Sequence, residues 1–275
     1  MSGTQGWADN RNAVFAEQVS VMRAAAIVFA RVQAPPDFAL QRMRNWLRVA
    51  RDTGAEFVLF PELALGHYFE TPVSLTGPEM DQLREDAQAL QVFIGAGVGE
   101  QQNAARYSSY VLIDRDGSLC VHRKSRWQTE QCPISLATEV CAHKLGTLSV
   151  GVLICSESRF SDVAGVLAQG GAEMLVVPHA YGGPPDDGED ASEWVPFSAA
   201  IETTVAARAR ETNLPAVAIG AVGPGLDGGF ALVDNRGATI CLELDSAETL
   251  HAFGICKSGK TVTFEKVLEG SGKMP

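Results

Sequence analysis

Positive charge is scarce in this chain, and long apolar runs are missing from its first part. The 275 residues include 22 lysines and arginines against 33 aspartates and glutamates, which gives a formal net charge of −11. An acidic surface repels phosphate backbones and anionic headgroups, so nucleic acid and membrane surfaces are disfavoured as partners. The longest early apolar stretch, residues 24–30, falls far short of the roughly 20 residues that a membrane-spanning helix needs. We therefore expect neither kind of partner.

The cysteines are scattered along the chain, and their spacing argues against several kinds of site. The six cysteines include no Cys-x-x-Cys pair, which disfavours a zinc knuckle or a thioredoxin-like site. The five histidines show no metal-ligand spacing either, so we expect no metal. Residues 1–12 lack a secretory pattern. Together these absences predict a cytoplasmic, reducing location in which most thiols are small buried apolar residues.

What is present is an ordinary globular composition, with 46% hydrophobic and 20% charged residues. No shift in composition marks a linker, so we expect one domain over residues 1–275, with 1–15 as a loose N-terminal arm and 257–275 as a C-terminal tail. Strand-like apolar runs alternate with helical patterns along the chain. This alternation favours an α/β fold of sheets covered by helices.

The patterns predict where these elements lie. Strands are expected at 21–30, 56–60, 92–98, 107–114, 118–123, 148–154, 173–177, 216–222, 229–234, 238–244 and 250–256. Helices are expected at 38–50, 78–90, 160–169 and within 193–213, with Asp37 as the N-cap of the first. Residues 179–193 have no periodicity and indicate a lid or a surface insertion. The acidic stretch 186–193 favours a cationic substrate, although a solvated loop explains it equally well.

Three residues of catalytic type each follow an apolar, strand-like run: Glu62, Lys124 and Cys155. Cys155 lies at a junction between a strand and a helix, where terminal N–H groups can stabilise a thiolate or bind an oxyanion. Each residue also has an inert interpretation. Cys155 could be a buried core thiol, Glu62 a solvated turn residue, and Lys124 part of a basic surface with its neighbouring arginines. The pattern favours the three gathered at one edge of a sheet.

The segments around these residues resemble the carbon–nitrogen hydrolase superfamily of nitrilases and amidases. The glutamate motif lies at 60–66, the lysine motif at 122–126 and the nucleophile motif at 150–160, in that order, and the resemblance covers roughly 21–256. It implies a four-layer α-β-β-α sandwich of the nitrilase type. It also implies a triad in which Glu62 is the general base, Lys124 stabilises the oxyanion and Cys155 is the nucleophile.

The resemblance implies roles for nearby residues as well. The backbone N–H of Ser156 would be a second oxyanion donor, and Glu157 and Arg159 would support the nucleophile loop. Many relatives carry a second glutamate after the lysine, which orients that lysine or contacts substrate. We prefer Glu130 over Glu139 for this role, and either could instead be an ordinary loop residue.

Three further side chains are expected to line the substrate pocket: His67, His179 and Tyr181. For the histidines, the alternative is a polar residue satisfied within the fold. Ser156 and Ser161 stand where relatives usually have an aromatic residue and a proline. Because classical nitrilases differ from this chain at the residue after the nucleophile, nitriles are disfavoured, and amide or carbamoyl substrates are favoured.

The function that the resemblance implies is hydrolysis of a linear amide in a small molecule through a thioester, without a cofactor. Relatives pair beside the helix that follows the nucleophile, so a homodimer or a larger homo-oligomer is expected. Hydrolysis of an N-carbamoyl amide, nitrile hydrolysis and acyl transfer to an amine remain open, because the same triad serves each of them. A non-catalytic sandwich that binds a ligand or a protein is the alternative from another class.

Overall fold

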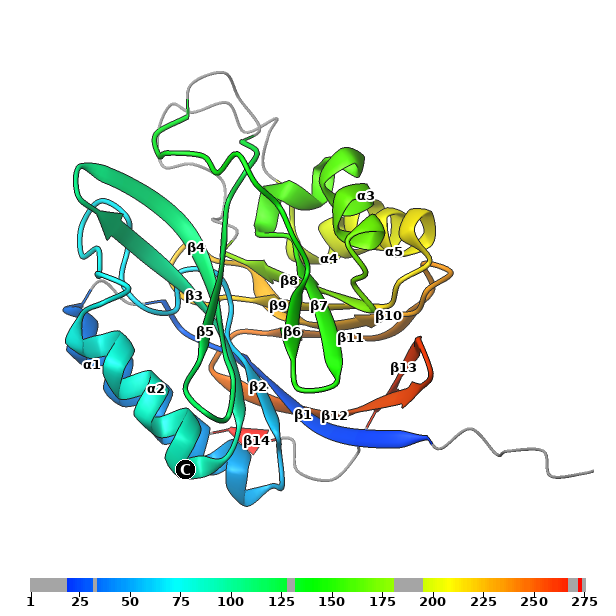
Figure 1. The fold of residues 1–275 in the computed structure, drawn as a ribbon, viewed down its shortest axis with the longest axis horizontal. Helices are drawn as coiled ribbons and strands as arrows, with labels where there is room; N and C mark the ends of the chain where they lie inside the picture. Colours follow the sequence, from blue (N-terminus) through cyan, green and yellow to red (C-terminus); the bar gives the residue numbers. More distant parts are fainter. Residues whose placement is uncertain (1–18, 32–33, 128–131, 181–194, 267–271, 274–275) are drawn as a thin grey trace, which may run out of the picture.

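Two mixed β-sheets packed face to face form the centre of the fold, with helices on their outer sides (Figure 1). The computed structural model describes residues 19–31, 34–127, 132–180, 195–266 and 272–273. The arrangement is the α-β-β-α sandwich that the resemblance implied. Among the described residues, no helix has the length and apolar character that crossing a bilayer requires.

The first sheet has eight strands in the order β13-β12-β1-β2-β3-β4-β5, with β14 paired to β12. Its strands are β1 (Ser20–Val28), β2 (Phe57–Leu59), β3 (Phe93–Gln102), β4 (Ala105–Ile113), β5 (Leu119–Arg123), β12 (Thr249–Ser258), β13 (Thr261–Lys266) and β14 (Gly272–Lys273). Helices α1 (Pro36–Asp52) and α2 (Pro78–Leu90) pack on its outer face.

The second sheet has six strands in the order β11-β10-β9-β8-β7-β6. They are β6 (His143–Leu145), β7 (Leu148–Val152), β8 (Met174–His179), β9 (Ala216–Gly220), β10 (Gly228–Val233) and β11 (Thr239–Asp245). Its outer side carries the 3-10 helix η1 (Cys155–Arg159), α3 (Ser161–Gln169), α4 (Phe197–Ala200), the π-helical segment η3 (Ile201–Val205) and α5 (Ala206–Thr212).

Strand β1 shows how the sequence builds these layers. Ala24, Ala26 and Val28 belong to the core between the two sheets, whereas Ala25 and Ile27 belong to the core beneath α1. Side chains on a strand point alternately to opposite faces, so a continuous apolar run is what a strand buried on both faces requires. This explains why the strand reads as unbroken apolar sequence.

The ends of the parallel strands place the candidate residues on one edge. Strands β1, β2 and β3 run parallel in the first sheet, and β7, β8 and β9 run parallel in the second. Strand β5 runs in the same direction as β3, because each is antiparallel to β4. Glu62 and Lys124 therefore follow strand ends of the first sheet, and Cys155 follows a strand end of the second.

The structure corrects some local predictions. Asp37 is not the N-cap of α1, because the helix begins at Pro36 with Pro35 as the cap, and the Asp37 carboxylate accepts the N–H of Phe38 within the first turn. Strands β6, β13 and β14 were not predicted. Strand β13 lies in the segment expected to be a tail, and it pairs with β12 and buries Val262 and Phe264.

Candidate active site

Glu62, Lys124 and Cys155, separated widely in sequence, meet in one buried cluster. Their exposed fractions are 5%, 3% and 7%, respectively. Lys124 Nζ donates to Glu62 Oε1 at 3.2 Å. The Cys155 thiol hydrogen-bonds with Glu62 and accepts from the backbone N–H of Ala180, at the end of β8. The Glu62 carboxylate thus interacts with both the ammonium and the thiol.

Cys155 is held in a strained turn. It is the first residue of η1, it follows β7 by way of Leu153 and Ile154, and its φ is +51°. A non-glycine residue with positive φ is uncommon, and such backbone strain costs of the order of 1–3 kcal/mol. The hydroxyl of Ser158 donates to the Cys155 carbonyl at 2.8 Å and fixes the turn. The fold therefore maintains an unfavourable conformation at this thiol.

Glu62 is positioned by a glycine on the neighbouring strand. A Cβ on Gly97 would lie 2.4 Å from the Pro61 carbonyl oxygen and 2.5 Å from Glu62 Cα. Only a residue without a side chain lets the turn after β2 lie against β3 so closely. On β4, the hydroxyl of Ser108 donates to Glu62 Oε1 at 2.9 Å. The carboxylate thus has fixed donors from Ser108 and Lys124.

The charges in the cluster are set by burial and by mutual contact. Burial alone would lower the pKa of Lys124, but Glu62 and Cys155 raise it well above its usual range, so the ammonium stays charged. Burial and then the charge of Glu62 raise the pKa of the Cys155 thiol to about 12, although Lys124 and the Ala180 N–H oppose them. The resting thiol is therefore protonated, and its activation requires a base.

Glu157 joins the lysine segment to the nucleophile segment. Its fully buried carboxylate accepts the N–H of Ile154 at 2.8 Å, the N–H and hydroxyl of Ser125 at 2.8 and 2.6 Å, and contacts His122 Nε2 at 2.9 Å. Burial would raise the pKa of Glu157, but His122 and Ser125 lower it overall. One carboxylate therefore sets the distance between the residues flanking Lys124 and Cys155.

The remaining predicted residues differ in burial and in hydrogen bonding, and some lie outside the described ranges. Ser156 is buried at 2% exposed, and its hydroxyl has no hydrogen-bond partner among the described residues. Arg159 accepts a bond from Arg208 Nη1 through its carbonyl at 3.2 Å, and the role expected for its side chain stays a prediction. Glu139 is exposed. Glu130, Tyr181 and residues 186–193 lie outside the described residues.

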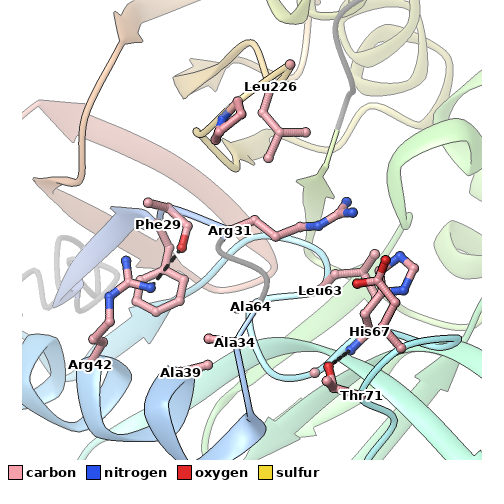
Figure 2. Close-up of a pocket in the computed structure, with 15 residues that line it drawn as sticks. Phe29, Arg31, Ala34, Ala39, Arg42, Leu63, Ala64, His67, Thr71 and Leu226 are labelled. Carbon is pink, nitrogen blue, oxygen red and sulfur yellow. Dashed lines mark hydrogen bonds between the residues drawn. The ribbon is translucent and has the colours of Figure 1, made fainter. Parts of the chain in front are cut away.

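The two candidate histidines differ in their surroundings. His179 is fully buried, with its ring edge against Phe197 at a centroid distance of 5.5 Å. Burial and then Lys124 lower the pKa of His179 to about 3, so it is neutral at physiological pH. His67 is half-buried, and burial followed by Arg31 lowers its pKa. His67 lines a cavity of about 370 Å³ (Figure 2), and His179 is not among the residues that line it.

Two aromatic residues near the triad were missing from the sequence predictions. Burial and then Glu62 raise the pKa of Tyr68, and Lys124 and Cys155 also act on it, so its hydroxyl lies within electrostatic reach of the whole triad. The ring of Trp127 lies 4.8 Å from Lys124 Nζ, which is a cation–π contact. Both belong to segments that directly follow triad residues, and that position was the available signal.

No group of three or more histidine, cysteine or acidic side chains among the described residues could hold a metal ion. The chemistry that these residues offer is that of an acid, a base and a nucleophile.

Comparison with known proteins identifies a family. The sequence profile of the carbon–nitrogen hydrolases matches residues 23–255. The N-carbamoylputrescine amidase of Solanum tuberosum is 30% identical over 165 residues, which cover 54% of this chain and 55% of that enzyme. The (R)-stereoselective amidase of a Pseudomonas species is 27% identical over 200 residues, which cover 70% of this chain and 69% of the relative. The first of these matches therefore spans only about half of the relative's length.

Solved structures share the architecture. The amidase of Nesterenkonia sp. AN1, determined in complex with butyramide, superimposes with a TM-score of 0.70 at 17% identity, covering 87% of this chain and 92% of that one. An identity this low supports a common fold and nothing finer.

Proposed function

The chain belongs to the carbon–nitrogen hydrolase family, and on that premise we propose that it hydrolyses a linear, non-peptide amide of a small molecule through a thioester on Cys155. The observation that carries this proposal is the state of the buried thiol. Its pKa is raised to about 12, and its hydrogen-bond partner is the carboxylate of Glu62. A protonated thiol bonded to a carboxylate is the resting arrangement that general-base activation needs.

The first half of the reaction forms the thioester. Glu62 takes the thiol proton as the sulfur attacks the carbonyl carbon. Lys124 and the backbone N–H of Ser156 stabilise the resulting oxyanion, in a site where low exposure strengthens such interactions. The C–N bond then breaks as Glu62 returns the proton to the leaving nitrogen, and ammonia or an amine departs.

The second half regenerates the enzyme. Water gives a proton to Glu62 and attacks the thioester carbon, and the same donors stabilise the second oxyanion. The C–S bond breaks, the carboxylic acid leaves and the thiol recovers its proton. Glu62 thus acts twice, and its two fixed donors, Ser108 and Lys124, hold it in place between the steps.

The test is intact mass and ammonia release with a panel of small amides that includes butyramide. We expect an acyl adduct and turnover with the wild type, and a loss of turnover by at least about 10³-fold in Cys155→Ala and Glu62→Gln. Cys141→Ala, which removes an exposed thiol, is the matched control and should retain activity. Full turnover or an adduct in Cys155→Ala would show that another group is the nucleophile.

A second candidate is the hydrolysis of an N-carbamoyl amine, which the similarity to the potato enzyme favours. The bond broken is again C–N, and the same three residues serve. The products distinguish the two: an N-carbamoyl substrate yields carbon dioxide and an amine with the ammonia, whereas an amide yields a carboxylic acid.

We also propose that the protein works in a reducing, cytoplasmic environment. All six of its cysteines are free thiols in the structure. A nucleophilic thiol keeps its activity only where oxidation does not trap it, and such conditions prevail in the cytosol.

A further inference from the structure

A cavity of about 370 Å³ is lined on one side by the loop that follows Glu62 (Figure 2). This loop contributes Leu63, Gly66 and His67 to the cavity. The opposite walls come from the ends of neighbouring strands, namely Arg31 just beyond β1 and Leu226 in the turn between β9 and β10. The cavity therefore lies on the same edge of the sandwich as the candidate catalytic residues.

Two arginines line this cavity, and the guanidinium group of one of them is already held by contacts within the fold. Arg42 forms an ion pair with Glu248, donates to the Ala30 carbonyl at 3.1 Å and lies 4.5 Å above the ring of Phe29. Glu248 also accepts from the indole N–H of Trp46 at 3.1 Å. Arg42 is therefore held in place, with its charge already compensated.

The second guanidinium, that of Arg31, is half-buried and makes no hydrogen bond or ion pair with the residues that the structure describes. In Figure 2 its side chain extends across the cavity toward the side where His67 lies. A partly desolvated cation without a partner has lost hydration without gaining a compensating contact. An anion in the cavity would supply that contact.

Arg31 also acts on the pKa of two side chains whose pKa the triad residues affect. Arg31 and Glu62 both act on the pKa of His67, and Arg31, Glu62 and Cys155 all act on the pKa of Tyr68. His67 lines the cavity, and Tyr68, the next residue along the chain, lies within electrostatic reach of both Arg31 and Cys155. A molecule with its amide at Cys155 could extend past them, so that its far end meets Arg31.

One negative charge also lines the cavity. Glu70 is exposed and forms no ion pair with Arg31 among the described residues. Water and salt screen an exposed carboxylate strongly, whereas a half-buried guanidinium is screened less. The cation of Arg31 therefore dominates the interior of the cavity.

We propose that this cavity binds a carboxylate of the substrate against Arg31, so that the enzyme acts on short amides that carry a carboxylate at the far end. This inference rests on the proposed amide hydrolysis. It also predicts that substrates ending in an ammonium, as N-carbamoylputrescine does, are poor ones, because Arg31 would repel that end.

Three amides of nearly equal size test the proposal: butyramide, succinamate, in which a carboxylate replaces the methyl group, and 3-aminopropanamide, which carries an ammonium. We expect the wild type to show at least about tenfold higher kcat/KM for succinamate than for the other two. Arg31→Gln should remove that preference by lowering kcat/KM for succinamate. Arg48→Gln, which alters an exposed arginine on α1, is the matched control and should keep the preference. Equal rates for succinamate and butyramide, unchanged in Arg31→Gln, would overturn the proposal.

Binding without turnover separates this proposal from the proposed function. Calorimetry on Cys155→Ala should show succinamate binding that weakens at least about tenfold when Arg31→Gln is added. That result supports the carboxylate site even if the wild type hydrolyses none of the amides, which would refute the proposed function alone. Equal succinamate affinity with and without the Arg31 change would refute the carboxylate site, whatever the activity.

Discussion

Single residues in the site are held in one backbone conformation and one protonation state. Cys155 keeps a positive φ and a protonated thiol, while Lys124 keeps its charge although it is only 3% exposed. Each state depends on the others, because Glu62 favours both the ammonium and the neutral thiol. The surrounding structure therefore stabilises one arrangement of protons before any substrate binds.

His179 gives a pH-dependent prediction at this scale. Burial lowers its pKa from 6.5 to about 3 in the folded protein, so below pH 6.5 the unfolded chain binds a proton that the native state does not. Its contribution to stability is complete above pH 6.5 and is lost as the pH falls toward 3. When the pH is lowered from 7 to 5, the free energy of unfolding measured with urea should fall by about 2 kcal/mol more in the wild type than in His179→Gln. Equal losses in the two proteins would show that His179 is protonated within the fold.

At the scale of elements, Glu157 is the contact that joins β5 to η1. Glu157→Gln would turn one of its acceptor oxygens into a donor facing N–H or O–H groups, so buried donors would lose their partners. We expect a loss of about 3 kcal/mol in the free energy of unfolding and a fall in kcat larger than the rise in KM. Asp162→Asn, which breaks only an exposed pair with Arg126, should change the stability by less than about 1 kcal/mol. A Glu157→Gln variant with normal stability and kcat would contradict this positioning role.

Two glycines in different elements provide another matched pair. Gly97→Ala would force the turn at Glu62 away from β3, because the added Cβ meets backbone atoms at 2.4–2.5 Å. We expect lower thermal stability and a loss of activity of at least about tenfold. Gly165→Ala in α3 meets nothing within 4 Å and should stabilise the protein by up to about 1 kcal/mol. Thermal unfolding and amide turnover of both variants test the difference, and normal activity in Gly97→Ala would mean that the turn can shift without consequence.

Most elements could be predicted because their hydrophobic periodicity extends over many residues and turn-forming residues mark their ends. The helix expected at 78–90 and found as α2 (Pro78–Leu90) is an example. Strand β6 has three residues, too few to show a period. The contacts of Glu62 could not be predicted, because they depend on register: Ser108 lies opposite Gly99 across the β3–β4 pair. Residue types and strand ends thus point to Glu62 and Cys155, and the family resemblance selects Lys124 among its basic neighbours. The side chains that fix these three residues depend on tertiary packing.

At the scale of the whole molecule, the site exists only where the two sheets meet. Glu62 and Lys124 follow strands of the first sheet, while Cys155 and Ala180 follow strands of the second. A shared apolar core holds the sheets together. Any change that alters how the sheets pack should therefore move the thiol relative to its base, even far from the site.

The expected homodimer is also a property of the whole molecule. Its interface is expected at α3, the helix that directly follows the nucleophile turn. Val163 and Leu167 of α3 are buried, whereas Val166 on its other side is 47% exposed. We propose that a second copy covers this side. Sedimentation should then show a dimer for the wild type and a monomer for Val166→Glu, since a buried charge opposes association. Leu244→Glu on β11, at an equally apolar exposed position, should leave the dimer intact. Because α3 continues from η1, the monomeric Val166→Glu variant should also lose activity. A wild type that is monomeric at micromolar concentration would rule out this role for α3.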